Sequence, residues 1–545
     1  MIRINQCKVG VPYTMQDVEK KVCQILHCMS EDIQKIHIVK ESLDARKKPA
    51  LFYSLVLDVA CRAEEKLLRN AKSKDVQPAP EKKYRFPVTA GFTCPDRPVI
   101  IGAGPAGLVC AYYLAEAGLR PIVLERGRCV ERRKADIDKF WETGVLDTAS
   151  NVQFGEGGAG TFSDGKLNTL IKDKYGRCRE VLSLFVKMGA PADILYKQKP
   201  HVGTDLLMGM VKNLRLAIIE LGGEVRFESK VTGLLLCKQP EQSGIGEGMQ
   251  AVKGVVVNGN TEILSDHIVL AIGHSARDTF EMLAETPLTM QPKDFAVGYR
   301  VQHFQEQIDE NQYGKQDEAC RKALGASSYK LTAQTKEGRG VYSFCMCPGG
   351  YVVNASSEKG RLAVNGMSYH DRESGVANAA IIMTVSKEDF PDQSPLGGVA
   401  FQRALEERAF QLADGKIPVQ SLGDFKKKEV CAEQNTDIAE LPIRIKGQWA
   451  FANTRSILPE KLNGAFLEGM EQFGRKIRGF DADDTMIAGI ESRTSSPVRI
   501  VRDEEGISSL MGLYPCGEGA GYAGGITSAA MDGLLTAERI AVSMV

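Results

Sequence analysis

At 545 residues the chain exceeds what one hydrophobic core usually supports, so we expect two or three domains. Its 43% hydrophobic and 25% charged residues are typical of an ordinary globular protein, and its formal net charge of zero gives no support to nucleic-acid or anionic-membrane partners. The 14 cysteines are scattered without a CxxC pair, the first residues lack a signal-peptide pattern, and no apolar stretch is long enough to span a membrane, so we expect a cytoplasmic protein with reduced thiols.

Residues 1–74 are predicted to form a small N-terminal α/β module. Strand-like runs IRINQC, IQKIHIVKE and ALFYSLVLDV alternate with helical patterns near Met15–Cys28 and Arg62–Leu68. The stretch 75–96 carries prolines and charges without periodicity, which is typical of a linker. We therefore expect a domain boundary there, and the module itself could dock a protein partner.

The strongest motif begins after Arg97. The apolar run Pro98–Ile101 has the composition of a buried parallel strand, and it leads directly into Gly102, Gly104 and Gly107 at GxGxxG spacing. Gly102 allows a tight strand-to-helix turn, Gly104 lets a pyrophosphate approach the backbone, and Gly107 lets the helix pack closely on the strand. The first helical amides, after Pro105 and Ala106, would then face the phosphates.

A second strand, Pro121–Leu124, ends in Glu125. An acid at this position accepts hydrogen bonds from a ribose 2′-hydroxyl, which favours FAD or NAD over a 2′-phosphorylated cofactor. The alternative is that three glycines fall at this spacing by chance. The strand, helix, second strand and acid in register argue against chance.

The segment 156–166 is rich in glycines and small hydroxyl groups. Such a segment lets backbone amides approach a phosphate or a flavin ring, although a tight surface turn is the alternative. The candidate cofactor contacts in it are Gly157, Gly158, Gly160, Thr161 and Lys166.

Three segments together resemble the glutathione-reductase-type FAD flavoproteins. GAGPAGL with LERG (124–127) is similar to their first FAD motif, AIG (271–273) to their return strand, and GLYPCGEGAGYAGGITSAAMDG (512–533) to their second FAD motif. The resemblance implies FAD as the cofactor, with Val231 lending backbone hydrogen bonds to adenine. It also implies cofactor contacts at Arg126, Gly273, Gly517, Glu518, Gly524, Gly525 and Ile526.

Glu518 departs from the Gly-Asp pair that is common in this superfamily, while keeping a carboxylate for the ribityl chain. From Arg97 to the end, the chain most resembles the uncharacterised bacterial FAD-dependent dehydrogenases. The likeness rests on EGGAGTFSDGKL (156–167), KPHVGTDLL (199–207), FCMCPGGYVVNAS (344–356), NGMSYHDR (365–372), ESRTSSPVRIVRD (491–503) and the C-terminal run. It implies a fold and a cofactor, but no known substrate.

These patterns predict an α/β fold with a Rossmann-like FAD-binding domain, a large inserted α+β substrate domain and the small N-terminal α/β module. The expected FAD-binding domain comprises residues 97–275 and 486–545. The stretch 276–485 lacks a nucleotide-binding signal, and we expect it to be the inserted domain that sets substrate choice.

The flavin carries redox chemistry itself, so the protein must bind, orient and tune it. His201 and His370 could bond a substrate or relay a proton, and Arg372 and Arg493 could hold an anionic substrate or stabilise the reduced flavin. Structural histidines and ordinary salt bridges are the alternatives. Cys345 and Cys347 form a CxC pair for which packing is favoured over redox exchange, and no cluster has metal-ligand spacing.

The leading hypothesis is an FAD-dependent reductase or dehydrogenase that acts on a small organic molecule. No second GxGxxG with an acid follows residue 107, so NAD(P)H is expected to visit transiently if it is the electron donor. One alternative is an assembly or RNA-associated protein with a structural flavin. Another is a monooxygenase, whose Asp-Gly motif cannot be placed, since Asp164-Gly165 and Asp532-Gly533 fall elsewhere in the order.

Overall fold

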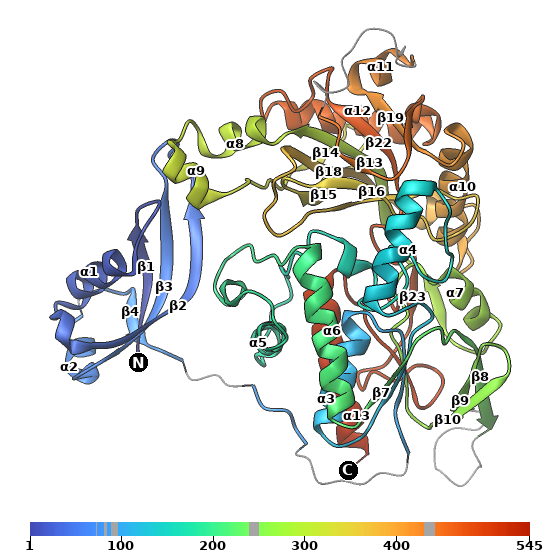
Figure 1. Cartoon of the computed structure of the whole chain (residues 1–545), viewed down its shortest axis with the longest axis horizontal. Helices are drawn as coiled ribbons and strands as arrows, with labels where there is room; N and C mark the ends of the chain where they lie inside the picture. Colours follow the sequence, from blue (N-terminus) through green and yellow to red (C-terminus); the bar gives the residue numbers. More distant parts are fainter. Residues whose placement is uncertain (72, 81–83, 89–95, 239–249, 430–441, 545) are drawn as a thin grey trace.

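The computed structural model describes all residues except 72, 81–83, 89–95, 239–249, 430–441 and 545. A small N-terminal unit lies to one side of a larger body, which contains a parallel sheet with its helices and, next to it, a second unit built on a wide, mostly antiparallel sheet (Figure 1). Among the described residues, every helix is too short or too polar to cross a membrane.

The N-terminal unit is a four-stranded antiparallel sheet in the order β2-β3-β1-β4. Its elements are β1 (Ile2–Val9), α1 (Met15–Leu26), β2 (Ile33–Asp44), β3 (Phe52–Cys61), α2 (Glu64–Asn70) and β4 (Val76–Pro78). Helix α1 starts at a capping box between Thr14 and Asp17 and buries one apolar face in the core of this unit. Strand β4 extends the sheet into residues that were expected to be linker, because it pairs with β1.

A five-stranded parallel sheet in the order β24-β11-β5-β6-β7 forms the middle of the body. Its strands are β5 (Val99–Ile101), β6 (Ile122–Leu124), β7 (Glu224–Arg226), β11 (Ile268–Leu270) and β24 (Leu513–Pro515). Strand β24 lies more than 400 positions after β5 in the sequence, yet both belong to this sheet, with β11 between them.

The two faces of this sheet pack against different layers. Alternate residues point to opposite faces of a strand, so Ile100 and Val123 pack under helices, whereas Val99 and Ile101 pack under a small antiparallel sheet. The first layer includes α3 (Pro105–Glu116), α6 (Thr204–Glu220) and α13 (Ile526–Ser543), with α4 (Val130–Thr143) and α5 (Arg177–Lys187) beside it. The second contains β8 (Val231–Lys238), β9 (Gln250–Val257), β10 (Thr261–Leu264) and α7 (Arg277–Ala284).

The second unit of the body is built on a seven-stranded sheet in the order β14-β15-β18-β13-β22-β19-β21. Its strands are β13 (Phe295–Phe304), β14 (Thr332–Gln334), β15 (Gly340–Cys347), β18 (Val376–Val385), β19 (Ile417–Ser421), β21 (Trp449–Phe451) and β22 (Met486–Glu491). The helices of this part are α8 (Gln305–Tyr313), α9 (Glu318–Leu324), α10 (Gly397–Leu412), α11 (Leu422–Lys427) and α12 (Glu460–Gly474). The remaining strands are β12 (Met290–Pro292), β16 (Tyr351–Asn354), β17 (Val364–Met367), β20 (Ile445–Lys446) and β23 (Val498–Ile500).

The chain returns to the parallel sheet later than the expected boundary at residue 486. Strand β22 still pairs with β13 and β19, because its continuous apolar run fits the middle of the seven-stranded sheet. The next strand, β23, pairs with β12, so the two crossings between the units run side by side.

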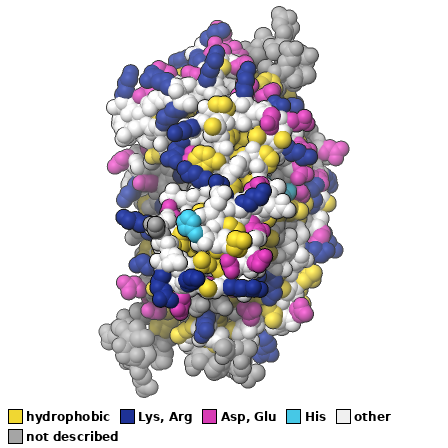
Figure 2. Space-filling view, turned by 90° about the vertical axis from the view of Figure 1, so that its left-hand side faces the viewer, with side chains coloured by type: hydrophobic (Ala, Val, Ile, Leu, Met, Phe, Trp, Pro, Cys, Tyr) yellow, Lys and Arg dark blue, Asp and Glu magenta, His cyan; other side chains and the backbone are white. Residues whose placement is uncertain are grey.

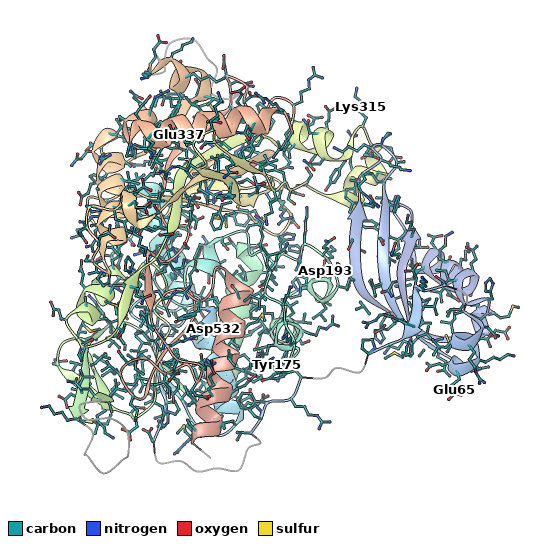
Figure 3. All side chains as sticks on the ribbon, turned by 180° about the vertical axis from the view of Figure 1, so that it is seen from behind. Glu65, Tyr175, Asp193, Lys315, Glu337 and Asp532 are labelled. Carbon is teal, nitrogen blue, oxygen red and sulfur yellow. The ribbon has the colours of Figure 1, made fainter. Side chains whose placement is uncertain are left out.

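The N-terminal unit touches the body through β2 and through the loops at one end of its sheet. Backbone hydrogen bonds join Glu41 to Tyr196 and Gln198, and Cys320 donates to the Val11 carbonyl. Figure 3 shows Asp193 and Lys315 on the parts of the body that face this unit. Seen from the side of the N-terminal unit, basic side chains are interspersed with acidic and apolar ones (Figure 2).

Candidate functional site

The turn between β5 and α3 has the geometry expected of a dinucleotide-binding motif. Gly102 has φ +104°, and a Cβ there would lie 2.4 Å from the Ala271 carbonyl oxygen. A Cβ on Gly107 would lie 2.0 Å from the Gly102 carbonyl oxygen, so the helix packs on the turn with no room for a side chain. Helix α3 begins at Pro105 without a side-chain cap, which leaves its first amides to an outside acceptor.

Glu125 lies directly after β6 and is only 5% exposed. One carboxylate oxygen accepts from the amide of Ala103 at 2.9 Å, and the other accepts from the amides of Gly127 at 2.8 Å and Gly155 at 3.0 Å. These bonds fix the carboxylate against the dinucleotide turn. An ionised carboxylate has about four lone-pair sites, so it can also accept from a hydroxyl group.

A buried arginine organises the glycine-rich loop that follows. The Arg133 side chain donates to the carbonyl groups of Asn151, Val152, Gly155, Glu156 and Gly158. Burial lowers the pKa of Arg133 to about 10, with the charges of Glu125 and Glu156 opposing that shift, so it stays cationic at neutral pH. No periodicity in the sequence distinguishes Arg133 from its charged neighbours on α4, and its role was not predicted.

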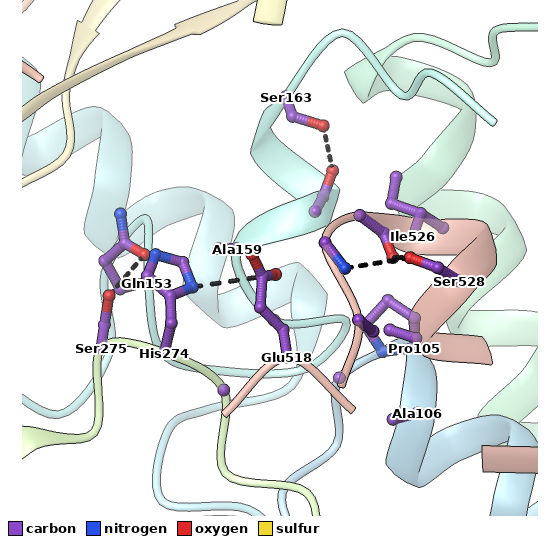
Figure 4. A pocket seen from close by; sticks show the side chains of 18 of the residues that line it. Pro105, Ala106, Gln153, Ala159, Ser163, His274, Ser275, Glu518, Ile526 and Ser528 are labelled. Atoms are coloured by element: carbon purple, nitrogen blue, oxygen red, sulfur yellow. Dashed lines mark hydrogen bonds and ion pairs between the residues drawn. The ribbon is translucent and has the colours of Figure 1, made fainter. Parts of the chain in front are cut away.

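The C-terminal segment brings a second helix start to the same place. After β24 the chain passes through Gly517 and Glu518, and α13 begins at Ile526. Its N-cap residue is Gly525, so no side chain bonds to the first amides of the helix. Figure 4 shows His274 facing Glu518, with His274 Nδ1 3.8 Å from Glu518 Oε2. His274, which directly follows the AIG run, was not predicted as a site residue.

Glu518 and His274 both have shifted pKa values. Burial raises the pKa of Glu518 to about 7, although the Lys293 ammonium partly opposes it, and the side chain keeps 24% exposure. Burial, with the nearby charges of Arg493 and Arg277, lowers the pKa of His274 to about 3. The pair at neutral pH is therefore a neutral imidazole beside a carboxyl group that gains and loses a proton in that range.

One cavity of about 940 Å³ connects these features. A side chain at Gly273, Gly524 or Gly525 would point into open space, with no atom within 4 Å of its Cβ. The glycines therefore leave bare backbone along the cavity wall, which suits the approach of a flat ring and its phosphates. By this test the residues present fit FAD.

Most residues expected to hold the cofactor border this cavity. They are Gly102, Gly104, Pro105, Ala106, Glu125, Arg126, Gly158, Gly160, Lys166, Val231, Gly273, Glu518, Gly524, Gly525 and Ile526. The others lie behind its wall: Gly107, Gly157, Thr161 and Gly517. Gly517 acts there through its amide, which donates to Asp532 at 2.7 Å.

The far end of the cavity is polar and reaches the seven-stranded sheet. Asp164 accepts from Arg372 Nη2 at 2.7 Å and from the Ser368 hydroxyl at 2.5 Å, and its Oδ2 lies 3.6 Å from Lys166 Nζ. Burial alone would raise the pKa of Asp164, but the charges of Lys166 and Arg372 outweigh it and hold the pKa at about 2. Asp164 had been noted only as part of an Asp-Gly pair, and its partners come from other segments.

His201 and His370 lie together, next to the cavity wall. Their rings stack with centroids 5.2 Å apart, His201 Nε2 lies 3.0 Å from the His370 carbonyl oxygen, and His370 Nδ1 lies 2.9 Å from the Val202 carbonyl oxygen. Neither ring is among the described residues that line the cavity. Burial and the charge of Arg372 lower the pKa of His201 to about 4, so it is neutral at neutral pH.

Arg493 borders the cavity, but its guanidinium group is engaged elsewhere. It donates to both carboxylate oxygens of Glu406, at 3.0 and 2.8 Å, and to the Ser357 hydroxyl. Arg277 holds the same Glu406 carboxylate. This buried network joins α7 and α10 and positions the loop after β22.

Cys345 and Cys347 lie at an irregularity in β15. The pairing of β15 with β18 shifts between Phe344 and Cys347, and Cys345 has φ +44°. Burial raises the pKa of both thiols, that of Cys347 to about 12, and the Cys347 thiol donates to the Cys345 carbonyl. Both are free thiols, and Cys345 borders the cavity.

Family models match three parts of the chain. Residues 294–494 match a model described as FAD-dependent protein, C-terminal domain-like, and residues 100–130 match an NAD(P)-binding Rossmann-like domain. Residues 1–60 match a domain of unknown function. An uncharacterised protein of Clostridium beijerinckii is 46% identical over 543 residues, which cover 99% of this chain and 98% of the relative.

Two solved structures illustrate the more distant likenesses. The FrdA subunit of E. coli quinol fumarate reductase is 12% identical, with 82% of this chain and 70% of that chain covered and a TM-score of 0.37. A geranylgeranyl bacteriochlorophyll reductase-like protein of Thermoplasma acidophilum is 12% identical, with 82% and 79% covered and a TM-score of 0.32. Likenesses at these scores identify no reaction for this chain.

Proposed function

The chain belongs to the same family as its Clostridium beijerinckii relative, a family of FAD-dependent flavoproteins, and from this premise we propose that it is an oxidoreductase that reduces or dehydrogenates a small organic molecule. The observation that carries the proposal is the cavity that connects the dinucleotide turn with the seven-stranded sheet. Its volume, about 940 Å³, is near the upper end of the range of roughly 300–1,000 Å³ for ligand pockets, and it extends from the dinucleotide turn to a polar end at the seven-stranded sheet.

The two ends of the cavity suit two different ligands. Bound FAD would supply the exchange of electrons, and the amides at the starts of α3 and α13, with Glu125, would hold it by its phosphates and ribose. The wall that includes Tyr329, Phe344 and Arg372 belongs to the unit with the seven-stranded sheet. In this proposal that unit sets substrate choice.

Titratable groups along the cavity could hold or move a proton. Glu518 exchanges a proton at its carboxylate near neutral pH, and it lies next to the neutral imidazole of His274. Asp164 stays ionised and fixes the Arg372 guanidinium at the polar end. These groups support an enzyme more than a protein in which the flavin is only structural.

Anaerobic mixing of the FAD-loaded protein with NADH or NADPH tests the proposal. We expect one of them to bleach the visible flavin band, because NAD(P)H is the proposed transient electron donor. Free FAD with the same donor is the control. If neither donor bleaches the flavin of a protein that dithionite reduces, direct reduction by a nicotinamide is wrong, and a structural flavin or another donor gains support.

A further inference from the structure

A cluster of basic groups surrounds the polar end of the cavity. Lys166, Lys199 and Arg372 all border it, and the Asp164 carboxylate, 2% exposed, lies among them. Lys199 stands at the more exposed rim and donates to the Ser328 hydroxyl at 3.1 Å. Partial desolvation and the positive charges of Lys166 and Arg372 lower the pKa of Lys199, so the three cations interact.

These cations outnumber the carboxylates available to them. Asp164 is ionised and offsets one of the three charges. Glu491 also borders the cavity, but the fully buried Arg300 holds it through both carboxylate oxygens, at 2.6 and 3.2 Å. Lys330, the residue after Tyr329, also borders the cavity, so the described residues at this end leave an excess of positive charge facing it.

Several donors at this end also lack acceptors. Lys166 Nζ, Arg372 Nε and the Tyr329 hydroxyl are buried atoms with no hydrogen-bond partner among the described residues. Tyr329 is only 7% exposed and borders the same cavity. Because buried polar atoms in folded proteins are nearly always partnered, three such donors at one place indicate a ligand that accepts hydrogen bonds.

The phosphates of the cofactor do not account for these donors. The loop approaches the start of α3 at Gly158, where a Cβ would lie 3.2 Å from the Gly104 Cα. Farther along, the loop turns away from α3. There Asp164 accepts a hydrogen bond from the Ser368 hydroxyl, and the backbone of Lys166 forms a β-bridge with the backbone of His201. Tyr329 belongs to the unit with the seven-stranded sheet.

We propose that this basic end binds the substrate through carboxylate groups, and that the substrate is a small dicarboxylate rather than a neutral molecule. The donors at this end belong to four separate segments of the chain: Lys166, Lys199, Tyr329 and Arg372. Donors that are spread in this way suit two spaced anionic groups better than one compact phosphate. The excess of positive charge at this end favours a dianion over a monoanion. The inference rests on the proposed function, because it takes this end as the substrate site.

Titration of the FAD-loaded protein with acetate, succinate and inorganic phosphate tests the inference. The readouts are the flavin absorbance spectrum and the melting temperature, neither of which requires turnover. We expect succinate to bind at least roughly tenfold more tightly than acetate, as an additional charged hydrogen bond implies. Equal binding of acetate and succinate, or tighter binding of phosphate than of succinate, overturns the dicarboxylate assignment.

Variants then locate the site. Lys199→Met should weaken succinate binding by roughly tenfold, whereas Lys174→Met, the same change at an exposed lysine outside the cavity, should leave it unchanged. Arg372→Lys keeps a charge beside Asp164 but loses the guanidinium geometry, so it should also weaken binding. If Lys199→Met and Arg372→Lys both bind succinate normally, or lose FAD instead, the basic end is not the substrate site.

The two proposals can fail separately. Succinate binding with no reduction by either nicotinamide would remove the proposed electron donor and leave this inference standing. Rapid flavin bleaching without binding of succinate would support the proposed electron donor and overturn the dicarboxylate inference.

Discussion

The Glu125 carboxylate accepts from three backbone amides, and in our proposal it also binds the ribose of the cofactor. Replacing it with alanine should weaken FAD binding by about 1–3 kcal/mol, because the ribose hydroxyl groups and three backbone amides lose their acceptor. Fluorescence titration of the apoprotein with FAD measures this loss. Glu116→Ala, at the exposed end of α3, is the matched control, and an equal affinity in both variants would mean that the ribose is held elsewhere.

Glu518 should make stability depend on pH. Its pKa of about 7 in the folded protein lies above the usual value of 4.5, so folding favours the protonated carboxyl group. The stability linked to this group is complete below about pH 4.5 and is lost as the pH rises through about 7. The apoprotein should therefore lose unfolding free energy over this range.

Glu518→Gln removes that dependence while keeping the shape of the side chain. Relative to the variant, the unmodified apoprotein should become progressively less stable between about pH 5 and pH 8 in denaturant unfolding. Glu156, whose pKa burial also raises to about 7, is present in both proteins and cancels in the comparison. A stability difference that does not change with pH would show that Glu518 does not titrate there.

At the scale of elements, the start of α13 is the most sensitive part of the proposed cofactor site. Gly525 has φ +137°, and a side chain there would point into the cavity. Gly525→Val should therefore abolish stable FAD binding, in addition to a backbone strain of about 1–3 kcal/mol. FAD content after purification and the melting temperature of the apoprotein measure the two effects.

Gly259→Val separates strain from obstruction of the cavity. Gly259 also has a positive φ, +81°, with open space around its Cβ, but it lies in the hairpin turn between β9 and β10. This variant should lose stability and keep its FAD. If both variants bind FAD equally well, the start of α13 does not contact the flavin.

The local elements could be predicted, whereas the contacts between distant segments could not. The β5–α3–β6 unit follows from consecutive residues, because Gly102 and Gly107 act on neighbours within one turn. Arg133 and Tyr329 have no such local signature. The roles of Arg133 and Tyr329 depend on contacts with segments that are distant in the sequence. For the same reason the sequence did not indicate that β4, in the expected linker, pairs with β1, or that β22, after residue 485, still belongs to the seven-stranded sheet.

At the scale of the whole molecule, the N-terminal unit braces two segments that lead to the cavity mouth. The Glu41 amide donates to the Tyr196 carbonyl at 2.8 Å, and the Gln198 amide donates to the Glu41 carbonyl at 2.9 Å. Lys199, at the rim, is the next residue along. On the other side, Tyr53 and Val11 bond to residues of α9, which leads to Tyr329.

Glu41→Pro should loosen this brace without disturbing the N-terminal sheet, because it removes an amide that points outward from the edge strand β2. The loss of one backbone hydrogen bond, about 0.5–1.5 kcal/mol, should raise hydrogen exchange at residues 196–199 several-fold and weaken dicarboxylate binding, with FAD content unchanged. Glu41→Ala is the matched control, since it removes the bond from the Tyr13 hydroxyl but keeps the amide. If exchange at residues 196–199 is the same in both variants, the N-terminal unit does not position the rim, and its role lies on another surface.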